Sequence, residues 1–205
     1  DLRYHFDVNT GVCHQVMVEA GLSLPGELVV ATDSHTTTHG AFGALGTGCG
    51  ATDMATILMT GELWFRVPEI IQVRLEGETK EGVYPKDVVL KVLRQIRADG
   101  AVYKAIVAGR MTICNMAVEM GAKTAYMQPN EDVLSYLKDR AQRGFEVLTT
   151  DEDFEFAEVH TIDVSAIEPQ LACPHSVDNV FDLQELIANG DVELDQGYIG
   201  SCTGG

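Results

Sequence analysis

Basic residues are scarce in this chain of 205 residues. Only 14 lysines and arginines stand against 31 aspartates and glutamates, which gives a formal net charge of −17. This charge argues against nucleic acid and against an anionic membrane surface as partners, because both carry negative charge themselves. We interpret most of the acidic residues as a solvated surface.

Long apolar runs and paired cysteines are also missing. No stretch approaches the roughly 18 apolar residues that can cross a membrane, and the start, DLRYHFDVNTG, lacks a signal-peptide pattern. The five cysteines are odd in number and widely spaced, and none forms a C-x-x-C pair, so a secreted disulfide scaffold is not expected. We therefore expect a reducing, cytoplasmic setting. The chain is long enough for one large domain or two small ones.

The most informative stretch is residues 29–61. An apolar run ends at Ala31 and predicts a short buried strand, which is followed by Asp33, Ser34 and His35. A glycine-rich turn should come next, and then a helix over 52–60 whose N-cap is the Thr or Asp at its start. Strand, polar tip, turn and helix is the order in which α/β proteins build sites at the carboxyl ends of strands. The alternative is a loop that contains a hydrogen-bonded structural histidine.

The five glycines between residues 40 and 50 do not form a nucleotide-binding signature. The pattern G-x-x-x-x-G-K-[ST] is absent, and the spacing does not give G-x-G-x-x-G followed by a suitable acidic residue. These glycines instead predict a close approach of the backbone to another segment or to a ligand.

Hydrophobic periodicity and turn residues predict the other elements. We expect a short helix ending at Gly21, a strand over 71–75, a helix over 85–97, a helix ending at Gly121, a helix over 129–144 and a strand over 192–199. Residues 145–165 should contain a short strand, a helical acidic stretch and a second strand. Residues 168–180 should be irregular.

The stretch DSHTTTHGAFGALGTGCGATDMA resembles the aconitase superfamily, most closely the large subunits of the 3-isopropylmalate dehydratase and homoaconitase group. Six further motifs follow in that group's order over nearly the whole chain: GVCHQV, GELWFRVPE, YPKDVVLKVL, RMTICNMAVEMGAK, EPQLACPHSVDNV and IGSCTGG. The resemblance implies a fragment of layered α/β domains, with parallel or mixed sheets flanked by helices. It divides the chain into a partial first domain (1–66), a second domain (67–145) and the start of a third (146–205).

The resemblance also implies a catalytic set. His14 should pair with Asp33 and His35 with Glu119, while Ser34 should hydrogen-bond the substrate. A carboxylate on one imidazole nitrogen fixes the tautomer and raises the basicity of the other nitrogen. We expect each pair within hydrogen-bonding distance.

A cofactor follows from the same resemblance. Cys202 matches the first of three cysteine ligands of a [4Fe-4S] cluster, and Asn115 matches a residue beside that cluster. From spacing alone, Asn115 and Glu119 share a helix face that could simply be solvated, and a lone loop cysteine is usually inert. Because a cubane cluster takes several thiolates, we expect the cluster in the full-length protein and not in this fragment.

The implied reaction is reversible dehydration of a small hydroxy di- or tricarboxylate. The first candidate is 3-isopropylmalate, in leucine biosynthesis, and the alternatives are homoaconitate and dimethylmalate. An iron of the cluster would act as a Lewis acid, while His14 and His35 would protonate or position the leaving hydroxyl. The catalytic base, a serine, would come from a swivelling domain on a separate small subunit.

Two other classes of function stay open. One is a non-catalytic α/β interaction module in which the glycines serve packing only. The other is a metal hydrolase using His14, Asp33 and His35, although no H-E-x-x-H set is present. Residues 99–110 also form a shorter segment than the resemblance implies. Either the protein carries a deletion here, or the sequence skips residues; we favour the second, which predicts a chain break or a spatial jump between Tyr103 and Arg110.

Overall fold

The computed structural model describes residues 2–107, 111–190 and 195–202. Helices and strands alternate along most of this chain, which confirms the predicted α/β class. In order, the elements are α1 (Cys13–Glu19), β1 (Leu28–Ala31), the 3₁₀ helix η1 (Ser34–Phe42), β2 (Leu45–Gly48), α2 (Ala51–Thr60), β3 (Ile70–Glu76), α3 (Pro85–Ile96), β4 (Ala105–Val107), α4 (Met111–Met116), η2 (Ala117–Met120), β5 (Thr124–Tyr126), α5 (Glu131–Lys138), β6 (Glu158–Asp163), η3 (Val164–Ala166), β7 (Gln170–Ala172), β8 (Val180–Asp182) and α6 (Leu183–Ala188).

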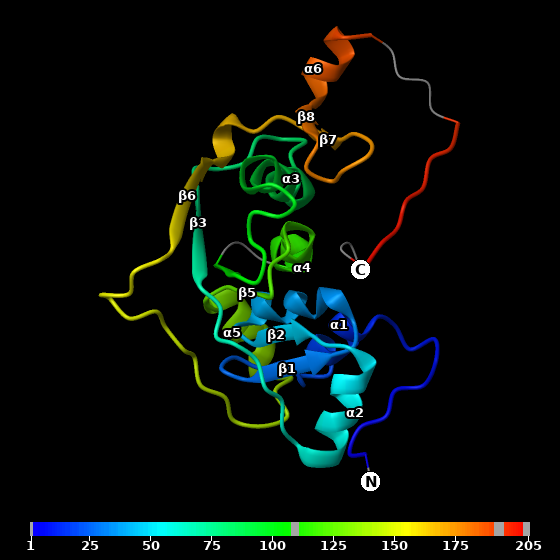
Figure 1. The fold of residues 1–205 in the computed structure, drawn as a ribbon, viewed down its shortest axis with the longest axis vertical. Helices are drawn as coiled ribbons and strands as arrows, with labels where there is room; N and C mark the ends of the chain where they lie inside the picture. The colour runs from blue at the N-terminus through cyan, green and yellow to red at the C-terminus, as the bar shows by residue number, and fades with distance from the viewer. Residues whose placement is uncertain (1, 108–110, 191–194, 203–205) are drawn as a thin grey trace.

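The strands of the described chain form three small sheets. The largest is fully parallel, in the order β5-β4-β3-β6, and a second parallel pair joins β1 to β2. The third is the antiparallel pair β7-β8. Figure 1 shows β3 and β6 along one side, with α3 and α4 beside them, and β1, β2, α1 and α2 gathered at the N-terminal end.

The main core lies between α3 and the four-stranded sheet. Alternate residues of β3 point into it, since Ile71 and Val73 are buried. The predicted apolar face of α3 is buried in full: Val88, Val89, Val92, Leu93 and Ile96. Each such side chain contributes about 1.5–3 kcal/mol relative to an exposed one, so α3 is the main support of this half of the fold.

The β1–β2 pair is attached to β5 by close backbone packing. Thr124 Oγ1 donates to the carbonyl of Gly46 at 2.6 Å, and Met127 N donates to the carbonyl of Gly40 at 2.9 Å. A Cβ at Gly40 would stand 2.0 Å from the carbonyl oxygen of Ala125. This glycine therefore permits the close approach to another segment that the sequence predicted. The domain limits after residues 66 and 145 stay a prediction.

The glycine-rich stretch is more regular than predicted, because residues 34–48 form η1 and β2 in place of one long turn. The threonine hydroxyls explain the 3₁₀ helix. Thr36 Oγ1 donates to the carbonyl of Asp33 at 2.5 Å, and Thr38 Oγ1 donates to that of His35 at 2.6 Å. The helix that follows, α2, is confirmed, but its N-cap is Gly50 and not the predicted Thr or Asp.

Later segments also differ from the prediction. Residues 145–157 form neither strand nor helix, and the elements within 145–165 are β6 and the start of η3. Most side chains of this segment are exposed, and a hydrogen bond of 2.6 Å from the Tyr126 hydroxyl to the carbonyl of Leu148 joins it to the rest of the fold. Residues 168–180 were predicted irregular but include β7 and the start of β8, and α5 ends at residue 138 and not at 144.

Two predictions fall partly on residues outside the description. Residues 195–199 are not a strand, so the predicted strand over 192–199 is wrong where it can be assessed. The predicted break between Tyr103 and Arg110 involves residues 108–110, which lie outside the described residues.

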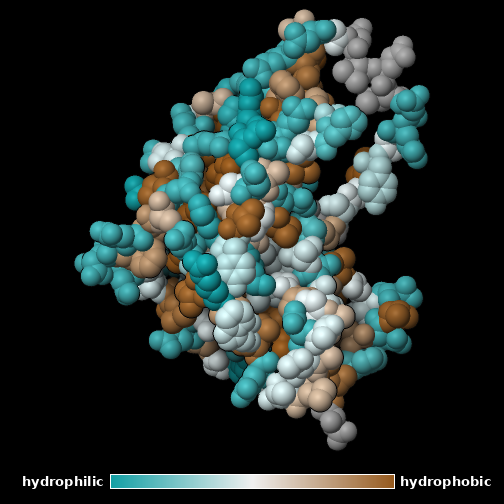
Figure 2. All heavy atoms as spheres, in the orientation of Figure 1, coloured by the Kyte–Doolittle hydropathy of each residue, from teal (hydrophilic) through white to brown (hydrophobic). Residues whose placement is uncertain are grey.

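Apolar side chains interrupt the hydrophilic surface in several places (Figure 2). Large exposed ones include Leu58 and Met59 on α2, and Trp64 and Val67 just after it. No residue of α2 is buried. No helix in the described ranges is long and apolar enough to cross a membrane.

Candidate functional site

The site begins where β1 ends. Asp33 caps η1, because its Oδ1 accepts a hydrogen bond of 2.7 Å from the backbone N–H of His35. This cap fixes the turn and presents three consecutive polar side chains at the carboxyl end of β1. The position agrees with the site predicted from the strand–turn–helix pattern.

The first carboxylate–imidazole pair joins α1 to this turn. His14 Nε2 lies 3.1 Å from Asp33 Oδ1, and the His14 side chain is only 2% exposed while that of Asp33 is half-exposed. Burial lowers the pKa of His14, although the Asp33 carboxylate opposes the shift. A neutral imidazole at pH 7 would therefore donate its Nε2–H to Asp33 and leave Nδ1 as the basic nitrogen. Nδ1 lies 3.5 Å from Cys13 Sγ.

The second pair connects segments 84 residues apart. His35 Nε2 lies 3.3 Å from Oε1 of Glu119, which belongs to η2. On the other side of the ring, Ser34 Oγ lies 3.3 Å from His35 Nδ1. If Nε2–H donates to Glu119, Nδ1 can accept from the Ser34 hydroxyl. Both predicted pairing distances are thus confirmed, while the catalytic roles of these residues stay predictions.

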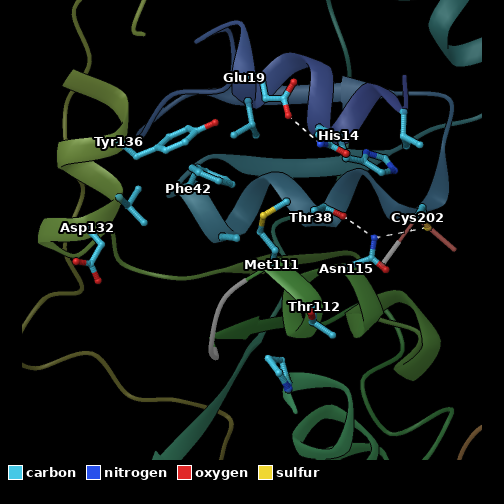
Figure 3. A pocket seen from close by; sticks show the side chains of 16 residues that line it. His14, Glu19, Thr38, Phe42, Met111, Thr112, Asn115, Asp132, Tyr136 and Cys202 are labelled. Carbon is cyan, nitrogen blue, oxygen red and sulfur yellow. Dashed lines mark hydrogen bonds between the residues drawn. The ribbon is translucent and has the colours of Figure 1, made fainter. Parts of the chain in front are cut away.

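Asn115 and Cys202 meet beside the first pair. The fully buried Asn115 donates from Nδ2 to Thr38 Oγ1 at 2.8 Å, and the same atom lies 3.8 Å from Cys202 Sγ. Figure 3 shows these side chains with His14 at one end of a cavity of about 680 Å³. Phe42 and Tyr136 line the other end. The cavity therefore has a polar end at the site and a largely apolar remainder that also includes Glu19 and Asp132.

A third histidine, His39, packs against His14, and the sequence did not predict a role for it. His39 is fully buried, its Nδ1 lies 3.0 Å from Ser23 Oγ, and its ring meets that of His14 edge-on at 5.7 Å between centroids. Burial lowers the pKa of His39 to about 4, with a smaller contribution from His14. The only signal in the sequence was a histidine at the end of the T-T-T-H run.

The described residues do not by themselves complete a metal site. No group of three or more His, Cys, Asp or Glu side chains in ranges 2–107, 111–190 and 195–202 is placed to hold a metal ion. Cys202 offers one thiolate, whereas burial raises the pKa of Cys114 to about 12 and keeps it a thiol. A [4Fe-4S] cluster would therefore need ligands beyond these residues. The same result counts against a metal hydrolase built on His14, Asp33 and His35.

The fold and the site define an α/β protein with two carboxylate-held histidines at the carboxyl ends of parallel strands. Residues 2–205 match the sequence profile of the aconitase family (aconitate hydratase), and the chain belongs to that family.

Curated relatives narrow the group within the family. The chain is 47% identical to a probable 3-isopropylmalate dehydratase large subunit of Methanothermobacter thermautotrophicus, with 100% of the chain and 51% of the relative covered. It is 46% identical to a probable methanogen homoaconitase large subunit of the same organism, covering 98% and 49%. A 3-isopropylmalate dehydratase large subunit 1 of Methanopyrus kandleri is 49% identical, covering 100% and 51%. The chain spans about half the length of these relatives.

Proposed function

We propose that this chain is part of the large subunit of a hydro-lyase that dehydrates and rehydrates a small hydroxy di- or tricarboxylate. The observation that carries the proposal is the convergence of His14–Asp33 and His35–Glu119 on one turn. Two imidazoles, each held by a carboxylate, suit a reaction that moves protons in both directions. Membership of the aconitase family supports this class of reaction.

The residues of this chain would transfer protons to and from the substrate and would orient it. Asp33 and Glu119 each hold Nε2 of one ring. The basic nitrogens are then Nδ1 of His14, beside Cys13, and Nδ1 of His35, beside Ser34. His14 or His35 would give a proton to the leaving hydroxyl and take one back in the reverse direction. Ser34 would hydrogen-bond the substrate beside His35.

A [4Fe-4S] cluster and a small subunit are part of the proposal, and the rest of the protein would complete both. Cys202 would supply one thiolate, and Asn115 would contact that sulfur as it does here. The remaining ligands would come from outside the described residues, so no step above depends on the cluster. The relatives' names as large subunits support a small-subunit partner, which would bring the catalytic base on a swivelling domain.

The preferred substrate is 3-isopropylmalate, in leucine biosynthesis. Relatives at similar identity carry the names of 3-isopropylmalate dehydratase and homoaconitase, so the names alone do not decide between them. The cavity beside His14 favours the first. Among the residues that the structure describes, its lining includes Val18, Phe42 and Val133 but no lysine or arginine. Glu19 and Asp132 also line it. Such a lining suits a branched alkyl group better than an additional carboxylate. Homoaconitate and dimethylmalate are the alternatives.

The test uses the full-length large subunit, purified without oxygen and mixed with its small subunit. We expect iron and acid-labile sulfide together with turnover of 3-isopropylmalate, and Cys202→Ser should abolish all three. Cys173→Ser, at a cysteine in the β7–β8 connection, is the matched control and should retain iron. Folded protein that was never oxidised but lacks iron and turnover would refute the proposal in favour of an interaction module.

A further inference from the structure

A second cavity, of about 400 Å³, lies at the carboxyl ends of β1 and β2. Thr32, Ser34, Gly48 and Lys123 are among the residues that line it. Ser34 is also a neighbour of His35 in the candidate site. This cavity therefore borders the turn that carries the proposed chemistry, at the edge where open α/β sheets bind ligands.

Lys123 is the cation of this cavity. Its Nζ donates to the carbonyl oxygen of Gly48 at 3.1 Å, which occupies one of three ammonium donors. Within the described chain, no carboxylate lies within 4.0 Å of this nitrogen, whereas Lys80, Lys91 and Lys104 each form an ion pair. A partly buried lysine without a counter-ion is unusual in a chain of net charge −17, and it suits an anionic ligand.

The backbone holds Lys123 firmly in this position. Its carbonyl accepts a hydrogen bond of 3.1 Å from Thr47 Oγ1 on β2, and its N–H donates to the carbonyl of Lys104 at 2.9 Å. Lys123 is thus fixed between the two parallel sheets, immediately before β5. These bonds fix the Cα of Lys123, from which its flexible side chain reaches the carbonyl of Gly48 in the cavity.

The other groups of the cavity agree with an anion. The hydroxyls of Thr32 and Ser34 can donate, and α2 starts at this cavity with its positive end. Asp53 is the acidic residue of the lining, but its Oδ2 accepts the N–H of Gly50 at 3.2 Å and caps α2. Its charge is therefore partly offset by the helix terminus.

We propose that Lys123 binds one carboxylate of the hydroxy-acid substrate in this cavity, while Ser34 contacts the same molecule. The inference rests on the proposed function and adds to it a counter-ion for the substrate that this chain itself supplies. Because such a contact exists before and during the reaction, it should act mainly on KM and little on kcat.

The first experiment compares Lys123→Met with Lys138→Met in the full-length large subunit, reconstituted with the small subunit. Lys138 ends α5 and carries the same charge, so it is the matched control. We expect Lys123→Met to raise the KM for the hydroxy-acid substrate about 10- to 100-fold, with kcat within about threefold and iron content unchanged. Lys123→Arg should recover most of the loss. A KM equal to that of Lys138→Met would overturn the proposal.

A second measurement needs neither turnover nor a folded variant. The wild-type large subunit is acetylated at lysines with and without malonate, a small dicarboxylate, and labelling of each lysine is read by peptide mass spectrometry. Malonate should slow the labelling of Lys123 at least fivefold and leave that of Lys138 unchanged; equal labelling of Lys123 in both samples would overturn the inference. Absence of turnover in wild-type enzyme whose Lys123 is protected would instead refute the proposed function alone.

Discussion

The buried His39 should make the stability of this fold sensitive to mild acid. Its pKa falls from 6.5 to about 4 because burial disfavours the charged ring. Above pH 6.5 the ring is neutral in the folded and unfolded states alike, and His39 does not alter the free energy of unfolding. Between pH 6.5 and 4 the unfolded chain takes up a proton that the folded chain refuses, so stability falls as the pH falls.

The size of the effect follows from the two pKa values. The loss of unfolding free energy attributable to His39 is about 2 kcal/mol at pH 5, and it approaches about 3 kcal/mol below pH 4. His14 acts in the same direction, because its pKa is also lowered by burial. The variant His39→Gln keeps a group that can hydrogen-bond Ser23 but cannot titrate, so it isolates the contribution of His39.

The assay is urea unfolding of the full-length large subunit, followed by circular dichroism at pH 7 and at pH 5. The loss of stability between the two pH values should be smaller in His39→Gln than in wild type by about 2 kcal/mol. His5→Gln removes an exposed histidine and serves as the matched control. If wild type and His39→Gln lose equal stability within about 0.5 kcal/mol, His39 is not buried as described and the argument fails.

Three further predictions concern catalysis, the core and backbone packing. Asp33→Asn should lower kcat about 10²- to 10⁴-fold with iron retained, since the amide cannot hold His14 in its basic form; an unchanged kcat would remove His14–Asp33 from the mechanism. Leu93→Ala should cost about 2–5 kcal/mol in urea unfolding, whereas Leu58→Ala, at an exposed residue, should cost under about 0.5. Equal losses would place α3 outside the core. Gly46→Ala puts a Cβ 2.1 Å from the carbonyl oxygen of Thr36 and should lower the melting temperature, while Gly144→Ala, with open space around it, should not; a melting temperature unchanged by Gly46→Ala would contradict that packing.

The elements predicted well from the sequence are those with a repeated pattern. The helix α3 has an apolar residue on every turn of one face, and β3 alternates, so periodicity identifies both. The strands β4, β5, β7 and β8 have three residues each, which is too short for any period to show. The strands β4 and β5 pair with partners distant in sequence, and β7 pairs with β8 across residues 173–179. No repeated local pattern records either kind of pairing.

The residues of the candidate site also divide into those that the sequence predicted and those that it did not. The pairs His14–Asp33 and His35–Glu119 were predictable because family motifs carry their residues, and the distances agree. The sequence did not point to His39 or Lys123, because the role of His39 depends on its burial and that of Lys123 on having no carboxylate nearby in the part of the chain that the structure describes. Neither property can be read from neighbouring residues, since tertiary packing decides both.

The contact between His35 and Glu119 joins two segments that are 84 residues apart in the sequence, η1 and η2. The geometry of this contact therefore depends on how the two segments pack against each other. If these segments separate by a few ångströms while every helix stays intact, His35 loses the carboxylate of Glu119 that orients it for the proposed proton transfer. If the proposed function holds, mild denaturant should therefore lower the activity of the full-length protein before the helical circular-dichroism signal changes.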